Sequence, residues 1–172
     1  MVSKSIVLDA NILIRAVLGQ RVRKLIIENI QTVDFFVPAI CLLDAHKYLP
    51  EIFEKRKLPV QPALDLLKTL EEIVHIVDEE IYAEYQEEAK ERMKIRDIDD
   101  WPIVATALVL NCPIWTEDKD FFGSGISIWT TDRVHIYLEE FQTQETKKAV
   151  QEADDGLFAP EQDVQNAFKK WQ

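Results

Sequence analysis

Short apolar runs alternate along the chain with longer segments in which apolar residues recur at helical spacing. The continuous runs are typical of parallel strands buried on both faces, and they predict strands at residues 5–8, 35–37, 73–77, 113–115 and 126–129. The helically spaced segments predict helices at residues 10–18, 21–30, 39–56, 62–72, 79–93 and 103–110. Because strands alternate with helices, we expect right-handed crossovers and a parallel sheet that helices cover on both faces.

Two local signals bear on the helix boundaries. Asp78 is a good N-cap for the segment at residues 79–93, whose apolar residues recur every four positions, so we expect one continuous helix there. Pro50 lies within the helix expected at residues 39–56 and should kink or interrupt it.

The length and composition limit the domain organisation. A chain of 172 residues, 47% of them hydrophobic, is long enough for one domain with a sizeable core and too short for two ordinary domains. From about residue 139 onward the sequence becomes polar. We therefore expect one domain over residues 1–141 and a polar C-terminal extension over residues 142–172 that is partly helical or flexible.

The composition also excludes several classes of function. The 4 glycines form no phosphate-binding pattern, which argues against P-loop and dinucleotide-binding proteins. Cys41 and Cys112 are widely separated, which argues against a disulfide framework and a zinc site. Because Asp9 ends the first apolar run, a signal peptide or membrane span is not expected there, and we expect a soluble cytoplasmic protein without membrane association.

The excess of acidic over basic residues limits the kinds of partner that the chain can bind. The formal net charge is −11, which argues against a general surface for polyanions such as nucleic acid. A dense group of carboxylates can nevertheless bind a divalent cation, which then attracts phosphate.

Several aspartates fall where ligands bind in parallel α/β sheets, at the carboxyl ends of the strands. Asp9 directly follows the first expected strand, and Asp118 follows the fourth. Asp97, Asp99 and Asp100 precede a helix that is apolar on nearly every side. Asp44, one turn into the helix after the second strand, would face the same edge. Mg²⁺ or Mn²⁺ held by Asp9, Asp44, Asp100 and Asp118 would activate water for phosphodiester hydrolysis.

Each of these residues also has an ordinary structural interpretation. Asp99 taken alone is more often a helix cap than a ligand, and Asp44 alone is an ordinary helix carboxylate. Arg96 belongs to a basic cluster that either holds a phosphate backbone beside the metal or complements a helix end. The joint placement of Asp9, Asp100 and Asp118 favours the metal site.

Three blocks of this sequence resemble the PIN domain, a family that includes VapC-type toxins and other small metal-dependent ribonucleases. The first block is Ile6-Val7-Leu8-Asp9-Ala10-Asn11-Ile12-Leu13, the second runs from Arg96 to Ala107, and the third is Trp115-Thr116-Glu117-Asp118-Lys119-Asp120-Phe121. Their order and spacing together are fairly specific, and the resemblance covers residues 1–141.

The resemblance implies a three-layer α/β/α fold with a five-stranded, mainly parallel sheet, and Mg²⁺- or Mn²⁺-dependent cleavage of RNA. It implies the following acidic positions: Asp9, Asp44, Asp100 and Asp118, with Asp97 and Asp120 as auxiliary metal ligands. Asn11 and Thr116 would be polar residues that orient the substrate. The second acidic residue of the family is usually Glu, so the shorter Asp44 leaves open whether one metal or two are bound.

Our main hypothesis from the sequence is an RNA endonuclease, the toxin of a type II toxin–antitoxin pair. A small antitoxin would then be its protein partner, and the amphipathic helices are also compatible with a homodimer. The alternative is a catalytically inactive binding module with the same fold. A phosphatase with an aspartyl nucleophile ranks third, because Asn11 occupies the place of its usual second aspartate.

Overall fold

The computed structural model describes residues 4–139 and residue 151. Its sheet has five strands in the order β3-β2-β1-β4-β5, and every neighbouring pair is parallel. The strands are β1 (Lys4–Leu8), β2 (Val33–Pro38), β3 (His75–Val77), β4 (Ile114–Trp115) and β5 (Ile128–Trp129). The expected five-stranded parallel sheet is thus confirmed, although β4 and β5 contain only two residues each.

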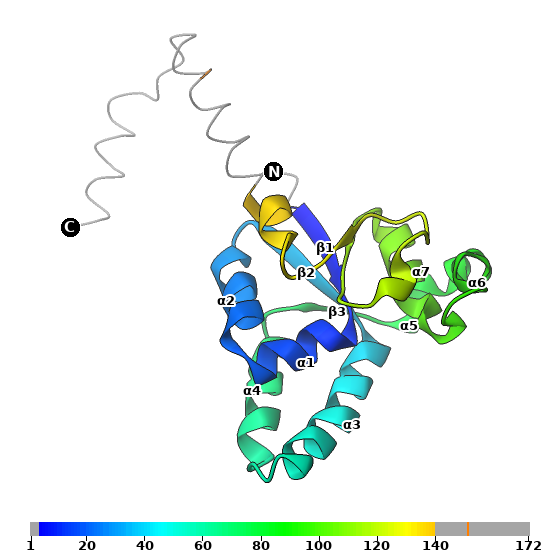
Figure 1. The fold of residues 1–172 in the computed structure, drawn as a ribbon. Coiled ribbons are helices and arrows are strands. Elements are labelled where there is room, and N and C mark those ends of the chain that lie inside the picture. Colours follow the sequence, from blue (N-terminus) through cyan, green and yellow to red (C-terminus); the bar gives the residue numbers. More distant parts are fainter. Residues whose placement is uncertain (1–3, 140–150, 152–172) are drawn as a thin grey trace. The chain divides into compact units, whose positions relative to one another are not determined.

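Helices cover both faces of this sheet. The first four are α1 (Ala10–Leu18), α2 (Gln20–Asn29), α3 (Ala39–Lys55) and α4 (Gln61–Glu71). The later ones are α5 (Glu79–Tyr82), α6 (Gln86–Met93) and α7 (Trp101–Leu110), with the 3-10 turns η1 (Ala83–Tyr85), η2 (Ile98–Asp100) and η3 (Lys119–Phe121). Figure 1 shows α1 to α4 on one side of the sheet and α5 to α7 on the other, which confirms the three-layer α/β/α arrangement.

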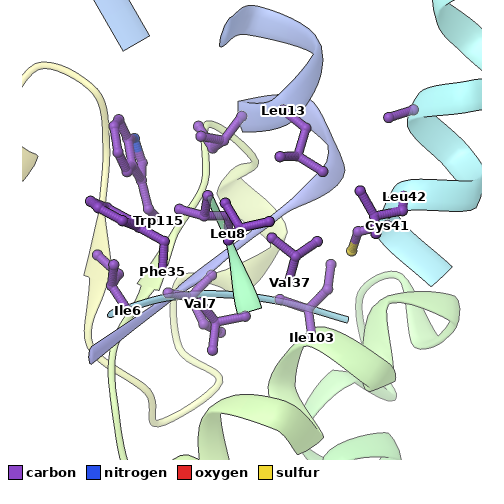
Figure 2. Close-up of a cluster of buried hydrophobic side chains, with 14 of the residues drawn as sticks. Ile6, Val7, Leu8, Leu13, Phe35, Val37, Cys41, Leu42, Ile103 and Trp115 are labelled. Carbon is purple, nitrogen blue, oxygen red and sulfur yellow. The ribbon is translucent and has the colours of Figure 1, made fainter. Parts of the chain in front are cut away.

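Alternating residues of β1 form the two halves of the core, because successive side chains of a strand point to opposite faces. Figure 2 shows Leu8 on the side of Leu13 from α1, and Val7 on the side of Ile103 from α7. Leu8, Leu13 and Val7 are fully buried. The central strand is therefore covered on both faces, as its uninterrupted apolar sequence predicts.

The prediction of one helix over residues 79–93 is wrong. The segment breaks into α5, η1 and α6, and Tyr82 at the first break is buried against Trp101 of α7, with ring centroids 5.7 Å apart. Glutamates also lie four residues apart, as at Glu80 and Glu84, and such like-charge pairs destabilise a continuous helix. Packing of Tyr82 together with this repulsion accounts for the tighter turn.

Pro50 lies inside α3 and does not end it. The chain divides after Leu138 into two units, and the second, Glu139–Gln172, lies outside the described residues except for Glu139 and residue 151. The extension expected at residues 142–172 therefore remains a prediction. Among the helices that the structure describes, none is both long and apolar enough to cross a membrane.

Candidate active site

The candidate site lies where the strand order reverses. The chain proceeds from β1 outward to β2 and β3, then returns to place β4 on the other side of β1. The helix α1, which follows β1, and the helices α5 to α7, which precede β4, consequently lie on opposite faces of the sheet, and this arrangement opens a crevice at the carboxyl ends of β1 and β4. Asp9 directly follows β1, and Thr116 directly follows β4.

A hydrogen-bond network joins the ends of β1 and β4. The Thr116 hydroxyl donates to Asp9 Oδ2 over 2.6 Å, and Asn11 Nδ2 also donates to Asp9 Oδ2. Thr116 Oγ1 in turn accepts the backbone N–H of Asp118 over 2.9 Å. Asn11 Oδ1 accepts the backbone N–H of Glu117 over 3.2 Å. The Asp9 carboxylate is only 6% exposed, and this network fixes its orientation relative to Asp118.

Five aspartates line one cavity of about 230 Å³ at this edge, which we call the aspartate cavity. They are Asp9, Asp44, Asp99, Asp100 and Asp118. Its described lining also includes Asn11 and Cys41 but contains no Lys, Arg or His. The structure thus brings together the four main acidic residues named from the sequence, without a protein cation among them.

Burial in the aspartate cavity raises the pKa of two of its carboxyl groups, Asp9 and Asp100. Burial is the largest cause for Asp100, followed by the charge of Asp9, and together with other nearby aspartates they raise its pKa to about 7. Burial likewise raises the pKa of Asp9, against the hydrogen bond from Thr116, which lowers it. Ionised carboxylates in such a place require a counter-charge.

Asp97 and Asp120 do not line the aspartate cavity. Asp97 accepts the backbone N–H of Asp99 over 3.0 Å at the start of η2. Asp118 accepts the backbone N–H of Asp120 over 2.8 Å, so Asp120 lies on η3. The charges of Asp97 and Asp120 still contribute to the raised pKa of Asp100. The interpretation of Asp99 as a cap is wrong, because Asp97 caps this turn and Asp99 lines the cavity.

Arg96 lies against the loop after η3 instead of at the aspartate cavity. A Cβ atom added to Gly123, whose φ is +91°, would meet Arg96 Nη2 at 2.7 Å. Arg92 supports the same loop, since its Nη1 donates to the carbonyl of Ser124 over 2.9 Å. The structural contact of Arg96 is therefore with a glycine turn, and its contact with substrate stays a prediction.

Comparison with known proteins agrees with this geometry. The family model described as PIN domain matches residues 7–139, more than half of the chain. The chain belongs to the PIN domain family. The matched residues include both ends of the Asp9–Thr116 network and every aspartate of the cavity.

Individual proteins are also similar to this PIN domain, with identities of 33% or less. Ribonuclease VapC1 from Methanocaldococcus jannaschii is 33% identical over 87 residues, which are 49% of this chain and 61% of that protein. The structure of PAE2754 from Pyrobaculum aerophilum matches with a TM-score of 0.62 and 14% identity over 80% of this chain and 90% of that one. VapBC2 from Rickettsia felis, bound to a DNA fragment from their promoter, matches with a TM-score of 0.54 and 16% identity, over 73% of this chain and 98% of that one. The two structures support the fold.

The donor set of this PIN domain suits a hard divalent cation. Within residues 4–139 and 151, no three His, Cys, Asp or Glu side chains converge closely enough to form a ready coordination group. The aspartates nevertheless surround one cavity, and burial, followed by the charge of Asp9, raises the pKa of Asp100 to about 7. Carboxylate oxygens are the ligands that Mg²⁺ and Mn²⁺ prefer, so these residues fit such an ion by chemistry.

Several residues of the site were not singled out from the sequence. Ile40 and Tyr48 line the aspartate cavity and lie four residues before and after Asp44 on α3, so helical spacing from Asp44 would have found them. Glu117 connects the network to the end of β5, because its carboxylate accepts the backbone N–H of Thr131 over 2.7 Å. No local sequence pattern predicts this hydrogen bond, because its two residues are 14 positions apart in the sequence.

The raised pKa of Asp100 predicts a pH dependence of stability in EDTA. Its carboxyl has an ordinary pKa of 3.8 and a folded pKa of about 7, so the folded protein binds more protons than the unfolded chain between these values. Stability therefore falls as the pH rises from about 4 to about 7. Thermal unfolding at a series of pH values, with Asp100→Asn alongside, measures this contribution as the difference between the two curves. Parallel curves would contradict it.

Proposed function

We propose that this PIN domain is a metal-dependent endoribonuclease and the toxin of a toxin–antitoxin pair. The observation that carries the proposal is the group of five aspartates around one cavity at the switch point of the sheet, with no cation among its described lining. Ribonuclease VapC1, which shares 33% identity over 87 residues, supports RNA as the substrate class. The matched region spans 61% of that relative, so its activity enters here as support for the proposal.

Asp9, Asp44, Asp100 and Asp118 would hold the cation. Bound Mg²⁺ or Mn²⁺ would supply a nucleophilic water at neutral pH and charge stabilisation for the phosphate. The protein contributes the orientation of its carboxylates. Thr116 donates its hydroxyl to the Asp9 carboxylate and accepts the backbone N–H of Asp118, so it links the Asp9 carboxylate to the backbone of Asp118.

The carboxyl group of Asp100 has a pKa near neutrality in the metal-free protein. It is half-buried, and its pKa of about 7 lets its carboxyl exchange a proton near neutral pH before a cation arrives. Asn11 has no titrating group, and it orients Asp9 while its own Oδ1 is held by Glu117. The auxiliary carboxylates Asp97 and Asp120 act on the site through their charge, since neither lines the cavity.

An antitoxin partner follows from the same chemistry. The aspartate cavity would accept an Arg or Lys side chain in place of the metal, and such charge complementarity favours association. Apolar side chains at its rim are exposed, with Ile40 at 40% and Tyr48 at 42%, and the adjacent Leu43 on α3 at 64%. A short amphipathic segment that carries a cation would cover both features.

The test is cleavage of labelled single-stranded and structured RNAs by the purified full chain in Mn²⁺, Mg²⁺ and EDTA. We expect cleavage in one or both metals and none in EDTA. Cleavage that persists in EDTA would contradict the metal-dependent proposal. Absence of cleavage on every RNA, with RNA affinity that EDTA does not change, would favour the inactive binding module, which the shorter side chain of Asp44 makes the second candidate.

A further inference from the structure

A second cavity, of about 560 Å³, adjoins the aspartate cavity, and Asn11 and Ile14 line both. We call it the arginine cavity, because Arg15, Arg21 and Arg56 are in its lining. These residues come from the end of α1, the start of α2 and the residue after α3. Three elements therefore bring positive charge to one place beside an acidic site.

The lining of the arginine cavity carries more positive than negative charge, with three arginines against the carboxylates of Glu117 and Asp132. The Asp132 carboxylate lies 3.8 Å from Arg21, but both side chains are more than half exposed, and such pairs contribute little. The Glu117 carboxylate is engaged by the backbone N–H of Thr131. Within the part of the chain that the structure describes, the guanidinium groups of Arg15 and Arg56 have no hydrogen-bond or ion-pair partner.

Three apolar side chains also line the arginine cavity, beside the polar residues Asn11 and Thr131 and the two carboxylates. Ile14, Leu18 and Val22 line the cavity between α1 and α2, and Val22 is buried. Arg15 follows Asn11 by four residues, so both lie on one face of α1. A ligand that leaves the aspartate cavity along this face would meet apolar side chains and guanidinium groups together.

Single-stranded RNA has this combination of groups. A strand whose scissile phosphate lies at the aspartates must also place its next phosphates nearby, where the acidic cavity offers no protein cation. Guanidinium groups bind phosphate in a planar, bidentate geometry, and they also stack on bases. Because the net charge is −11, a local cationic site strengthens the binding of RNA to the protein.

We propose that the arginine cavity binds the RNA segment next to the scissile phosphate, with Arg15 and Arg56 on backbone phosphates and Ile14, Leu18 and Val22 against a base. The inference rests on the proposed nuclease function and adds the second part of its substrate site. Arg15 and Arg56 set affinity for the strand, whereas the aspartates carry the reaction.

The test measures RNA binding by the full chain in EDTA, so that it does not depend on cleavage. Fluorescence anisotropy with a labelled uridine oligomer of about 12 nucleotides, a length that covers a single-strand groove, gives Kd at several salt concentrations. In Arg15→Gln/Arg56→Gln we expect Kd to rise about tenfold and the slope of log Kd against log salt to fall by about 1.4, because two phosphate contacts are lost. The matched control is Lys55→Gln/Lys68→Gln, which removes the same charge from exposed positions outside the cavity.

A second readout separates this inference from the nuclease proposal. In Mn²⁺, the arginine variant should raise KM about tenfold and leave kcat within about twofold, as expected when binding alone is lost. Arginine-dependent RNA binding without any cleavage would support the cavity and contradict the nuclease. An equal loss of affinity in the lysine control would overturn the cavity. Unchanged RNA affinity, combined with arginine-dependent binding of polyglutamate, would also overturn it, in favour of an acidic peptide.

Discussion

Asp100→Asn should abolish RNA cleavage, by about 10³-fold or more, and should leave the protein folded. The substitution removes one of the carboxylates proposed to hold the cation and the group whose pKa is raised to about 7. It also removes the repulsion between Asp100 and Asp9, so the metal-free variant should be more stable by about 1 kcal/mol, or roughly 3 °C in Tm. Cleavage in Mn²⁺ and thermal unfolding in EDTA measure the two effects.

The matched control for this variant is Asp78→Asn. Asp78 also stands at the start of a helix, but its side chain makes no capping hydrogen bond and it lies outside the aspartate cavity. We expect its cleavage rate to equal that of the unmodified protein. Cleavage by Asp100→Asn at an undiminished rate would remove Asp100 from the site. A lower Tm would contradict the electrostatic account.

The positions of Asp9 and Asp118 could be predicted because each is local to the end of a strand. The first apolar run stops at Asp9, and Asp118 comes three residues after the fourth run, so each run determines the strand and the edge near which the carboxylate lies. The five strands and their parallel arrangement followed from the same runs. Even so, the sequence pattern overestimated the strand near residue 128, where only Ile128–Trp129 pair with β4.

The sequence could not predict which aspartates between Asp97 and Asp100 line the aspartate cavity. Asp97, Asp99 and Asp100 are neighbours in sequence, and only the 3-10 turn η2 decides which of them line the cavity. In that turn the backbone N–H of Asp99 donates to the Asp97 side chain. The sequence alone does not indicate which of the three aspartates accepts this hydrogen bond. The break between α5 and α6 likewise depends on the contact of Tyr82 with Trp101, which lies 19 residues away in the sequence.

The arginines of the arginine cavity could not be predicted from the sequence either. Arg15, Arg21 and Arg56 are not a cluster in the sequence, whereas the conspicuous cluster that contains Arg92 and Arg96 supports a glycine loop. The fold therefore determines which cations are near the site. The density of charge along the sequence does not predict a cationic site whose residues come from three different elements.

Thr116→Val should lower the stability of the protein by about 3 kcal/mol, or roughly 10 °C in Tm, at neutral pH. Valine has nearly the same shape but leaves the buried Asp9 carboxylate without its 2.6 Å hydrogen bond and the Asp118 N–H without its acceptor. Because the Asp9 side chain then keeps only the hydrogen bond from Asn11 and is oriented less precisely, cleavage should fall about 10²-fold. Thermal unfolding and cleavage in Mn²⁺ measure the two losses.

Thr106→Val is the matched control for this variant. Thr106 is also fully buried, but its hydroxyl donates within α7 to the carbonyl of Pro102 over 2.8 Å, away from the carboxylates. We expect a loss of about 1 kcal/mol and unchanged cleavage. Thr116→Ser keeps the hydroxyl and should retain most of the activity. If Thr116→Val and Thr106→Val reduced cleavage equally, Thr116 would be a packing residue, and the coupling of Asp9 to Asp118 through its hydroxyl would be wrong.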